Sequence, residues 1–208
     1  MDSYLVPAGY GEAEYIDKKS RFIGRVWPVE SESEAQAHIR EMRSKYADAT
    51  HNVWAYLLRD GTMRYSDDGE PGGTSGQPTL NVFRAGEVYD VCCVVTRYFG
   101  GILLGSGGLV RAYSSTARMA LEAAGLARMA LWRCGRIACG YGKYEQVRRL
   151  LEDYGAAVEN TEFAADVRLS YAVPDDRADT LLRAALELTA GTAVTEELGT
   201  AFRGVPLA

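Results

Sequence analysis

The sequence is poor in the residues from which metal centres and disulfide frameworks are built. Its 208 residues include four cysteines and two histidines. Four cysteines are too few for the disulfide framework of a secreted protein of this length, so we expect reduced thiols. Cys92 and Cys93 point to opposite faces if they lie in a strand, and Cys134 and Cys139 lack the second cysteine or histidine pair that a zinc site needs. We therefore expect no zinc and no cofactor.

Signatures of common enzymes and of membrane proteins are also absent. The sequence has no His-Glu-x-x-His, no Gly-x-Ser-x-Gly and no phosphate loop ending in Gly-Lys-Ser or Gly-Lys-Thr, so most hydrolase and nucleotidase templates are unsupported. No apolar run approaches the roughly 18 residues of a membrane span. The N-terminal segment lacks a basic region followed by an apolar one. We expect a cytoplasmic protein that does not contact a membrane.

The charge balance does not favour a chain held broadly against nucleic acid or acidic lipid. The 23 basic and 28 acidic side chains give a formal net charge of −5 at pH 7, so any basic patch must be local. Apolar residues make up 47% of the chain, which indicates a packed core rather than disorder.

Glycine is concentrated in the middle of the chain, where 11 of the 22 glycines lie between Gly61 and Gly108. A capping box at 33–36 predicts the start of a helix, and Asp60-Gly61 predicts a tight hairpin. The expected strands of this half span residues 21–29, 53–58, 63–66 and 88–99, and the expected helices span 33–46, 77–84 and 109–124. The segment 88–99 is predicted to be a central strand that is buried on both faces.

The C-terminal part of the chain has a more regular pattern. Strands are expected at 131–140, 157–163, 167–173 and 192–198, and helices at 143–154 and 175–190. This order, β-α-β-β-α-β, is the ferredoxin-like arrangement. We place a boundary near 126–133 and expect an α+β protein of two domains, 1–130 and 131–208.

The segment 96–111 joins a predicted strand to a predicted helix through two glycine turns. Glycines permit positive φ angles, and a helix start presents unpaired amides that suit an anion. One or both of Arg97 and Arg111 are expected to add contacts to a phosphate, and Ser106 offers a hydroxyl. One of the two aromatic residues after Arg97 faces outward and can stack on a base or peptide. The candidate binding residues are Arg97, Tyr98, Gly100, Gly101, Gly105, Ser106, Gly107, Gly108 and Arg111.

A second polar loop precedes this segment and contains the only tight carboxylate cluster, Asp67, Asp68 and Glu70. Magnesium bridging a phosphate would use such oxygen ligands, and the alternative is a solvated turn. His51, at a strand entrance, is either a base or a hydrogen-bonding anchor. The candidate binding residues of this part are His51, Asp67, Asp68, Glu70, Gly72, Gly73 and Thr74. In the simplest interpretation, the two loops only pack on each other.

Four segments that carry these residues resemble the YigZ/IMPACT family. They are HNVWAY at 51–56, DDGEPGGTSGQP at 67–78, VVTRYFGG at 94–101 and LGSGGLVRAY at 104–113. The tail is similar to the C-terminal domain of the bacterial members, so the resemblance covers nearly the whole chain.

The resemblance implies an N-terminal domain of the left-handed β-α-β superfamily, which includes domain IV of elongation factor G. It also implies a ferredoxin-like C-terminal domain similar to domain V of that factor. Eukaryotic relatives are linked to translational control, where they compete for an activator of the kinase that senses uncharged tRNA. Bacterial members lack an established reaction, and kinship of fold alone does not fix a function.

Three hypotheses follow. The first is a non-catalytic, translation-associated regulatory protein that binds RNA, the ribosome or a protein partner through a cleft lined by glycine and arginine. The second is a metal-assisted enzyme that acts on a phosphorylated small molecule or nucleotide, and its weakness is the lack of a nucleophile. The third is a structural adaptor whose loops bind nothing.

Overall fold

The computed structural model describes residues 3–207, which form two compact units. The first unit contains residues 3–128 together with 204–207, and the second contains 129–203. No helix among the described residues is both long and apolar enough to cross a membrane.

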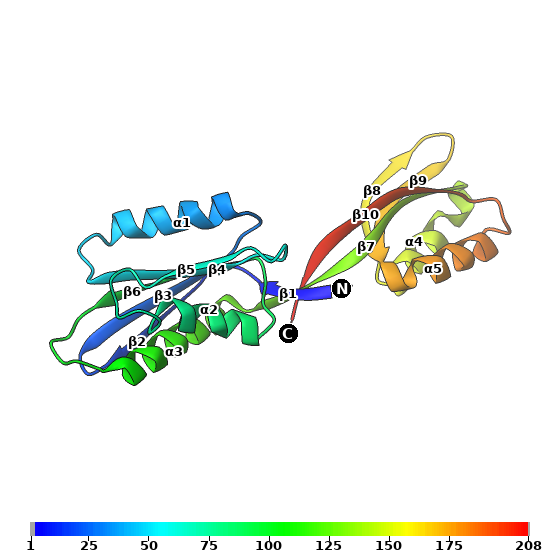
Figure 1. The fold of residues 1–208 in the computed structure, drawn as a ribbon. Coiled ribbons are helices and arrows are strands. Elements are labelled where there is room, and N and C mark those ends of the chain that lie inside the picture. The colour runs from blue at the N-terminus through cyan, green and yellow to red at the C-terminus, as the bar shows by residue number, and fades with distance from the viewer. Residues whose placement is uncertain (1–2, 208) are drawn as a thin grey trace. The chain divides into compact units, whose positions relative to one another are not determined.

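The first unit is built on a five-stranded antiparallel sheet with the order β2-β3-β6-β4-β5. These strands are β2 (Gly11–Asp17), β3 (Ser20–Pro28), β6 (Val91–Tyr98), β4 (His51–Leu57) and β5 (Met63–Ser66). The helix α1 (Glu32–Lys45) covers one face, and α2 (Gly76–Ala85) and α3 (Ser106–Ala124) cover the other (Figure 1).

The central strand β6 is buried on both faces, as its apolar sequence predicted. Cys92 and Val94 belong to the apolar cluster that includes buried residues of α1. Cys93 and Val95 belong to the cluster that includes buried residues of α2 and α3, such as Tyr113. Because water is excluded from both clusters, burial raises the pKa of both thiols well above the ordinary value.

Two strands and two element starts differ from the sequence prediction. Neither β1 (Ser3–Pro7) nor β2 was predicted, because β2 alternates charged residues with only two partly buried apolar ones, Ala13 and Tyr15. The first helix is capped by Ser31, whose Oγ accepts a hydrogen bond from the Glu34 amide at 3.3 Å, rather than by Ser33. The helix α3 begins at 106 and includes two glycines that propensity would place outside it.

The second unit has the predicted ferredoxin-like order. Its elements are β7 (Leu126–Cys139), α4 (Tyr144–Asp153), β8 (Ala157–Phe163), β9 (Val167–Pro174), α5 (Asp175–Leu188) and β10 (Val194–Pro206). The strands lie in the order β10-β7-β9-β8, and β1 pairs with β7, whose first residues belong to the first unit. The last strand is longer than the expected 192–198, because its two glycines obscure the strand pattern. The two-unit α+β architecture is thus confirmed, and the left-handed crossover of the first unit stays a prediction.

Candidate functional site

Four loops meet at one end of the first sheet. The antiparallel register places Arg21 opposite Tyr98, and His51 opposite Arg97. The starts of β3 and β4 therefore lie beside the end of β6. We call the residues that connect these strand ends, 18–19, 46–50, 67–75 and 99–105, the sheet-end surface. It contains most of the candidate residues that the sequence singled out.

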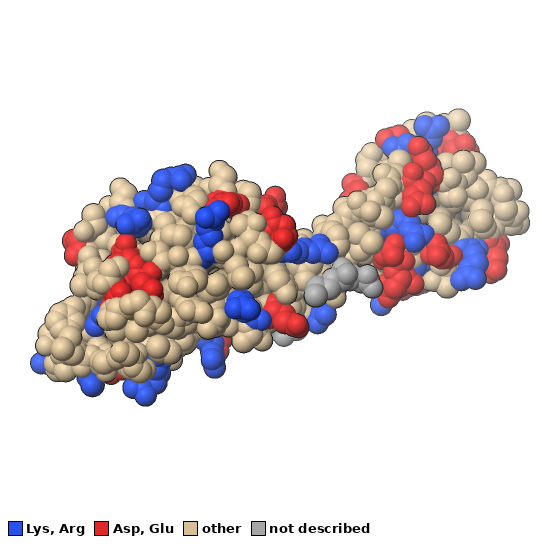
Figure 2. Space-filling view, in the orientation of Figure 1, with Lys and Arg blue, Asp and Glu red and all other residues tan. Residues whose placement is uncertain are grey.

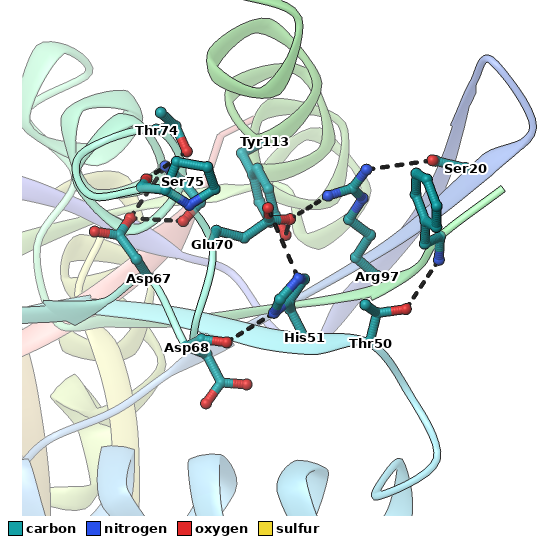
Figure 3. A network of polar contacts seen from close by, with 12 residues as sticks. Ser20, Thr50, His51, Asp67, Asp68, Glu70, Thr74, Ser75, Arg97 and Tyr113 are labelled. Carbon is teal, nitrogen blue, oxygen red and sulfur yellow. Dashed lines mark hydrogen bonds and ion pairs between the residues drawn. The ribbon is translucent and has the colours of Figure 1, made fainter. Parts of the chain in front are cut away.

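Glu70, a buried residue of the loop 67–75, is the centre of a polar network (Figure 3). Its side chain is 3% exposed, and its Oε1 accepts hydrogen bonds from Arg97 Nη1 at 2.5 Å and from the Tyr113 hydroxyl at 2.7 Å. Burial and the neighbouring Glu70 carboxylate raise the pKa of Tyr113, so this hydroxyl stays protonated and donates. The network connects the loop 67–75 to β6 and α3.

Arg97 lies inside the fold and not at the surface. Besides its ion pair with Glu70, it donates to Ser20 Oγ at 3.4 Å, and its guanidinium carbon lies 5.3 Å from the Phe22 ring centroid and 5.5 Å from that of Phe99. The sequence predicts an exposed ligand for an anion at this position. For Arg97 this prediction is wrong, because Arg97 belongs to the strand that is buried on both faces, and Glu70 already neutralises its charge.

His51 is held as an anchor. Its Nδ1 lies 2.8 Å from the backbone carbonyl of Asp68, and since a carbonyl only accepts, this nitrogen carries the proton. Its Nε2 lies 3.8 Å from Glu70 Oε2. Both ring nitrogens thus face protein groups, so the geometry favours the structural interpretation of His51 over that of a base.

The three clustered carboxylates diverge. Asp67 Oδ1 accepts hydrogen bonds from the Ser75 hydroxyl at 2.6 Å and from the Gly76 amide at 2.8 Å, at the start of α2. Asp68 pairs with Arg43 at 3.0 Å, while Glu70 points inward. Within residues 3–207, no three histidine, cysteine or acidic side chains are arranged to hold a metal ion. These three carboxylates therefore do not converge on one point, as shared ligands of a magnesium ion would.

We expect the replacement Asp67→Asn to destabilise the protein in a pH-dependent way. Burial raises the pKa of Asp67, but hydrogen bonds from the Ser75 hydroxyl and three loop amides outweigh it, so that this pKa lies below the ordinary 3.8. The stabilisation is therefore complete above pH 3.8 and is lost as the pH falls through the lower folded-state value. At pH 7 the variant should lose about 1 kcal/mol of unfolding free energy, as for other helix-start acceptors.

The difference in unfolding free energy between the wild type and Asp67→Asn should become smaller as the pH falls from 4 to 2, which urea titrations at several pH values would measure. Glu41→Gln is the control, because Glu41 is exposed on α1 and has no hydrogen bond or ion pair within residues 3–207. If the difference in unfolding free energy between the wild type and Asp67→Asn stayed constant down to pH 2, the assigned role of Asp67 would be contradicted.

The remaining candidate residues divide by burial. Thr74 and Gly108 are buried, and Tyr98 and Gly100 are half-buried. The Gly100 amide donates to Ser20 Oγ at 3.2 Å, because β6 continues close against the turn that precedes β3. The exposed candidates are Gly72, Gly73, Gly101, Gly105, Ser106, Gly107 and Arg111. The structure thus brings the two loops together, but Arg97 points inward to Glu70, so it does not line an open cleft with Arg111.

The sequence analysis did not identify the most exposed apolar residues of the surface. Ile102 is 44% exposed and Leu103 is 81% exposed, next to Phe99 at 45%. Lys18 Nζ donates to the Leu103 carbonyl at 3.4 Å, which places a basic side chain beside this apolar tip. The available signal was the run Ile-Leu-Leu between two glycine turns, where a loop would ordinarily carry polar residues.

A separate groove of about 840 Å³ lies between α2 and α3. It is lined by apolar residues such as Val82 and Leu121, with Arg118 at its side. None of the candidate residues lines it, so the sheet-end surface and the groove are different features.

The fold and the site define a protein with an antiparallel sheet between two helical layers, a buried Glu-Arg-Tyr network at one sheet end, and a ferredoxin-like second unit. Comparison with known proteins gives this class a family. The Impact N-terminal domain matches residues 18–121, which include every candidate residue, and a domain of unknown function, DUF1949, matches 137–192.

The IMPACT family member YvyE of Bacillus subtilis is 33% identical over 199 residues, covering 95% of this chain and 92% of that protein. The member YigZ of Escherichia coli is 34% identical over 178 residues, covering 84% and 87%. A solved crystal structure of a hypothetical protein is 30% identical and covers 94% of this chain and 97% of its own, with a TM-score of 0.61. The chain belongs to the IMPACT family.

Proposed function

We propose that this protein is a non-catalytic regulator of translation that binds RNA, the ribosome or a protein partner through the sheet-end surface, in the cytoplasm. Membership of the IMPACT family suggests the role in translation. The observation that carries the binding role is the Glu70 network, which ties the loop 67–75 to β6 and α3, while the apolar side chains of the loop 99–105 and the lysines of the turn 18–19 face solvent.

The arrangement has the properties of a preorganised binding surface. A loop that is already rigid loses less conformational entropy when a partner docks. Phe99, Ile102 and Leu103 supply exposed apolar anchors, which are the kind of residue that dominates binding energy when a partner covers them. Exposed Lys18 and Lys19 beside them favour a partner with negative charge.

The same geometry gives less support to the enzyme hypothesis. Catalysis requires a group that is free to exchange a proton or to attack a substrate. His51, Asp67 and Glu70 each have protein partners, and the nearby Tyr113 hydroxyl is buried with a raised pKa. The adaptor hypothesis explains the buried network but leaves the exposed apolar tip without a role.

We expect the double variant Ile102→Ser, Leu103→Ser to weaken binding to purified bacterial ribosomes about tenfold, which corresponds to about 1.4 kcal/mol. Both side chains are exposed, so their loss should leave the unfolding free energy within about 0.5 kcal/mol of the wild type. Co-sedimentation measures the binding. The matched control is Val194→Ser, Leu198→Ser, which removes two exposed apolar side chains from β10. Equal binding by all three proteins would contradict a role for the sheet-end surface on the ribosome.

A further inference from the structure

The outer face of α3 carries a line of polar side chains that the sheet-end surface does not include. Arg111 and Arg118 are both exposed, and Ser114 and Ser115 lie half-buried between them. Seven residues are close to two helical turns, so the two arginines share one face of the helix and their backbones lie roughly 10 Å apart. We call these four residues the α3 strip.

Both arginines of the strip lack an ionic partner. Within residues 3–207, neither guanidinium has an ion pair or a hydrogen bond. Some arginines of the first unit are paired, such as Arg21 with Glu14, and Arg43 with Asp68, whereas Arg40, Arg84 and Arg128 are unpaired within residues 3–207 like those of the strip. Arg111 and Arg118 differ from these in that both lie on one exposed helix face, so that one partner can contact both charges.

The loop that leads into α3 lies next to further basic residues. Lys18 Nζ reaches the Leu103 carbonyl, so the turn with exposed Lys18 and Lys19 lies beside the loop that leads into α3. In Figure 2, basic side chains recur along the lower rim of the first unit, with few acidic ones between them, and Figure 1 shows α3 on that side. Glu122, one turn beyond Arg118, is the acidic residue that follows the strip on this helix.

We propose that the α3 strip binds the phosphate backbone of single-stranded RNA. Charges spaced along a line, with serine hydroxyls between them, suit a partner that carries repeated phosphates. An anionic membrane is less suited, since the apolar side chains that flank the strip, Val110 and Met119, are only 39% and 38% exposed. The exposed Phe99 ring offers a stacking platform for a base near the start of the helix. This inference rests on the proposed function in that it selects RNA among its partners, but the arginines that it tests lie outside the sheet-end surface.

The test compares two charge-matched double variants by fluorescence anisotropy with a labelled 20-nucleotide single-stranded RNA. The first, Arg111→Gln with Arg118→Gln, removes both charges of the strip. The control, Arg40→Gln with Lys45→Gln, removes two exposed charges from α1 on the opposite face of the same sheet. We expect the strip variant to bind at least tenfold more weakly at 100 mM salt. A plot of log affinity against log salt concentration has a negative slope, and this slope should become less steep by about 1.4, or about 0.7 for each lost phosphate contact. The control should stay within twofold of the wild type.

Three outcomes would overturn the proposal: no RNA binding by the wild type, equal losses in both double variants, or equally tight binding to phosphatidylglycerol vesicles. In each case ribosome binding by the Ile102 and Leu103 variants still decides the proposed function separately, because those side chains lie outside the strip.

Discussion

Replacing Glu70 with glutamine is expected to lower the free energy of unfolding by about 3–5 kcal/mol, the usual result when one member of a buried ion pair is removed. The Arg97 side chain is 6% exposed and would keep its charge with no carboxylate beside it. The Tyr113 hydroxyl would lose its charged acceptor at 2.7 Å. Urea unfolding measures the loss, and thermal unfolding should show a parallel fall in Tm.

Two further variants make this expectation specific. Glu14→Gln breaks the exposed pair with Arg21 and should leave the free energy of unfolding almost unchanged, because solvent screens this pair. Combining Glu70→Gln with Arg97→Met removes both buried charges, so the double variant should be more stable than the sum of the single losses indicates. A loss below 1 kcal/mol for Glu70→Gln alone would show that the network does not hold the loops.

The second large effect is expected from Gly100→Ala. A Cβ atom at this position would lie 2.0 Å from the Lys19 carbonyl carbon and 2.4 Å from the Ser20 nitrogen. Both are backbone atoms, so the turn before β3 or the end of β6 must move. We expect a loss of about 1–3 kcal/mol, as for other overpacked sites. Hydrogen exchange should also show faster exchange of the residue-100 amide, which donates to Ser20 Oγ.

Gly72→Ala is the matched control. No atom lies within 4 Å of a Cβ built there, and its φ lies outside the positive range. Its stability should be unchanged or rise by up to about 1 kcal/mol through the unfolded state. If Gly100→Ala behaved like Gly72→Ala, the turn would be free to move, and the sheet-end surface would not be rigid.

The parts of the fold that depend on local signals could be predicted from the sequence. The hairpin at Asp60-Gly61 and the double burial of β6 both follow from short stretches of residues. The strands β1 and β2 could not be predicted in this way. The Gly11 backbone in β2 packs directly against Ala120 and Ala124 of α3, so its place depends on a contact made more than 100 residues later in the chain.

The residues that meet at the sheet end could be singled out from the sequence, but the contacts that they make with one another could not. The sequence placed Glu70 with two neighbouring aspartates and Arg97 with a glycine turn, and each grouping suggested a ligand. In the fold the two side chains neutralise each other across 27 residues of chain. Such a pairing depends on which strand end meets which loop, and short-range patterns do not contain that information.

The two neighbouring cysteines of β6 have a practical consequence. The sulfur of Cys92 lies in the cluster with α1, and that of Cys93 lies in the cluster with α2 and α3. A fluctuation that lifts α1 would give a reagent access to one sulfur, while a fluctuation of the other layer would give access to its neighbour. The rate at which a thiol reagent labels Cys92 would therefore report local opening of the α1 layer. The labelling rate of Cys93, the next residue, would report opening of the α2 and α3 layer.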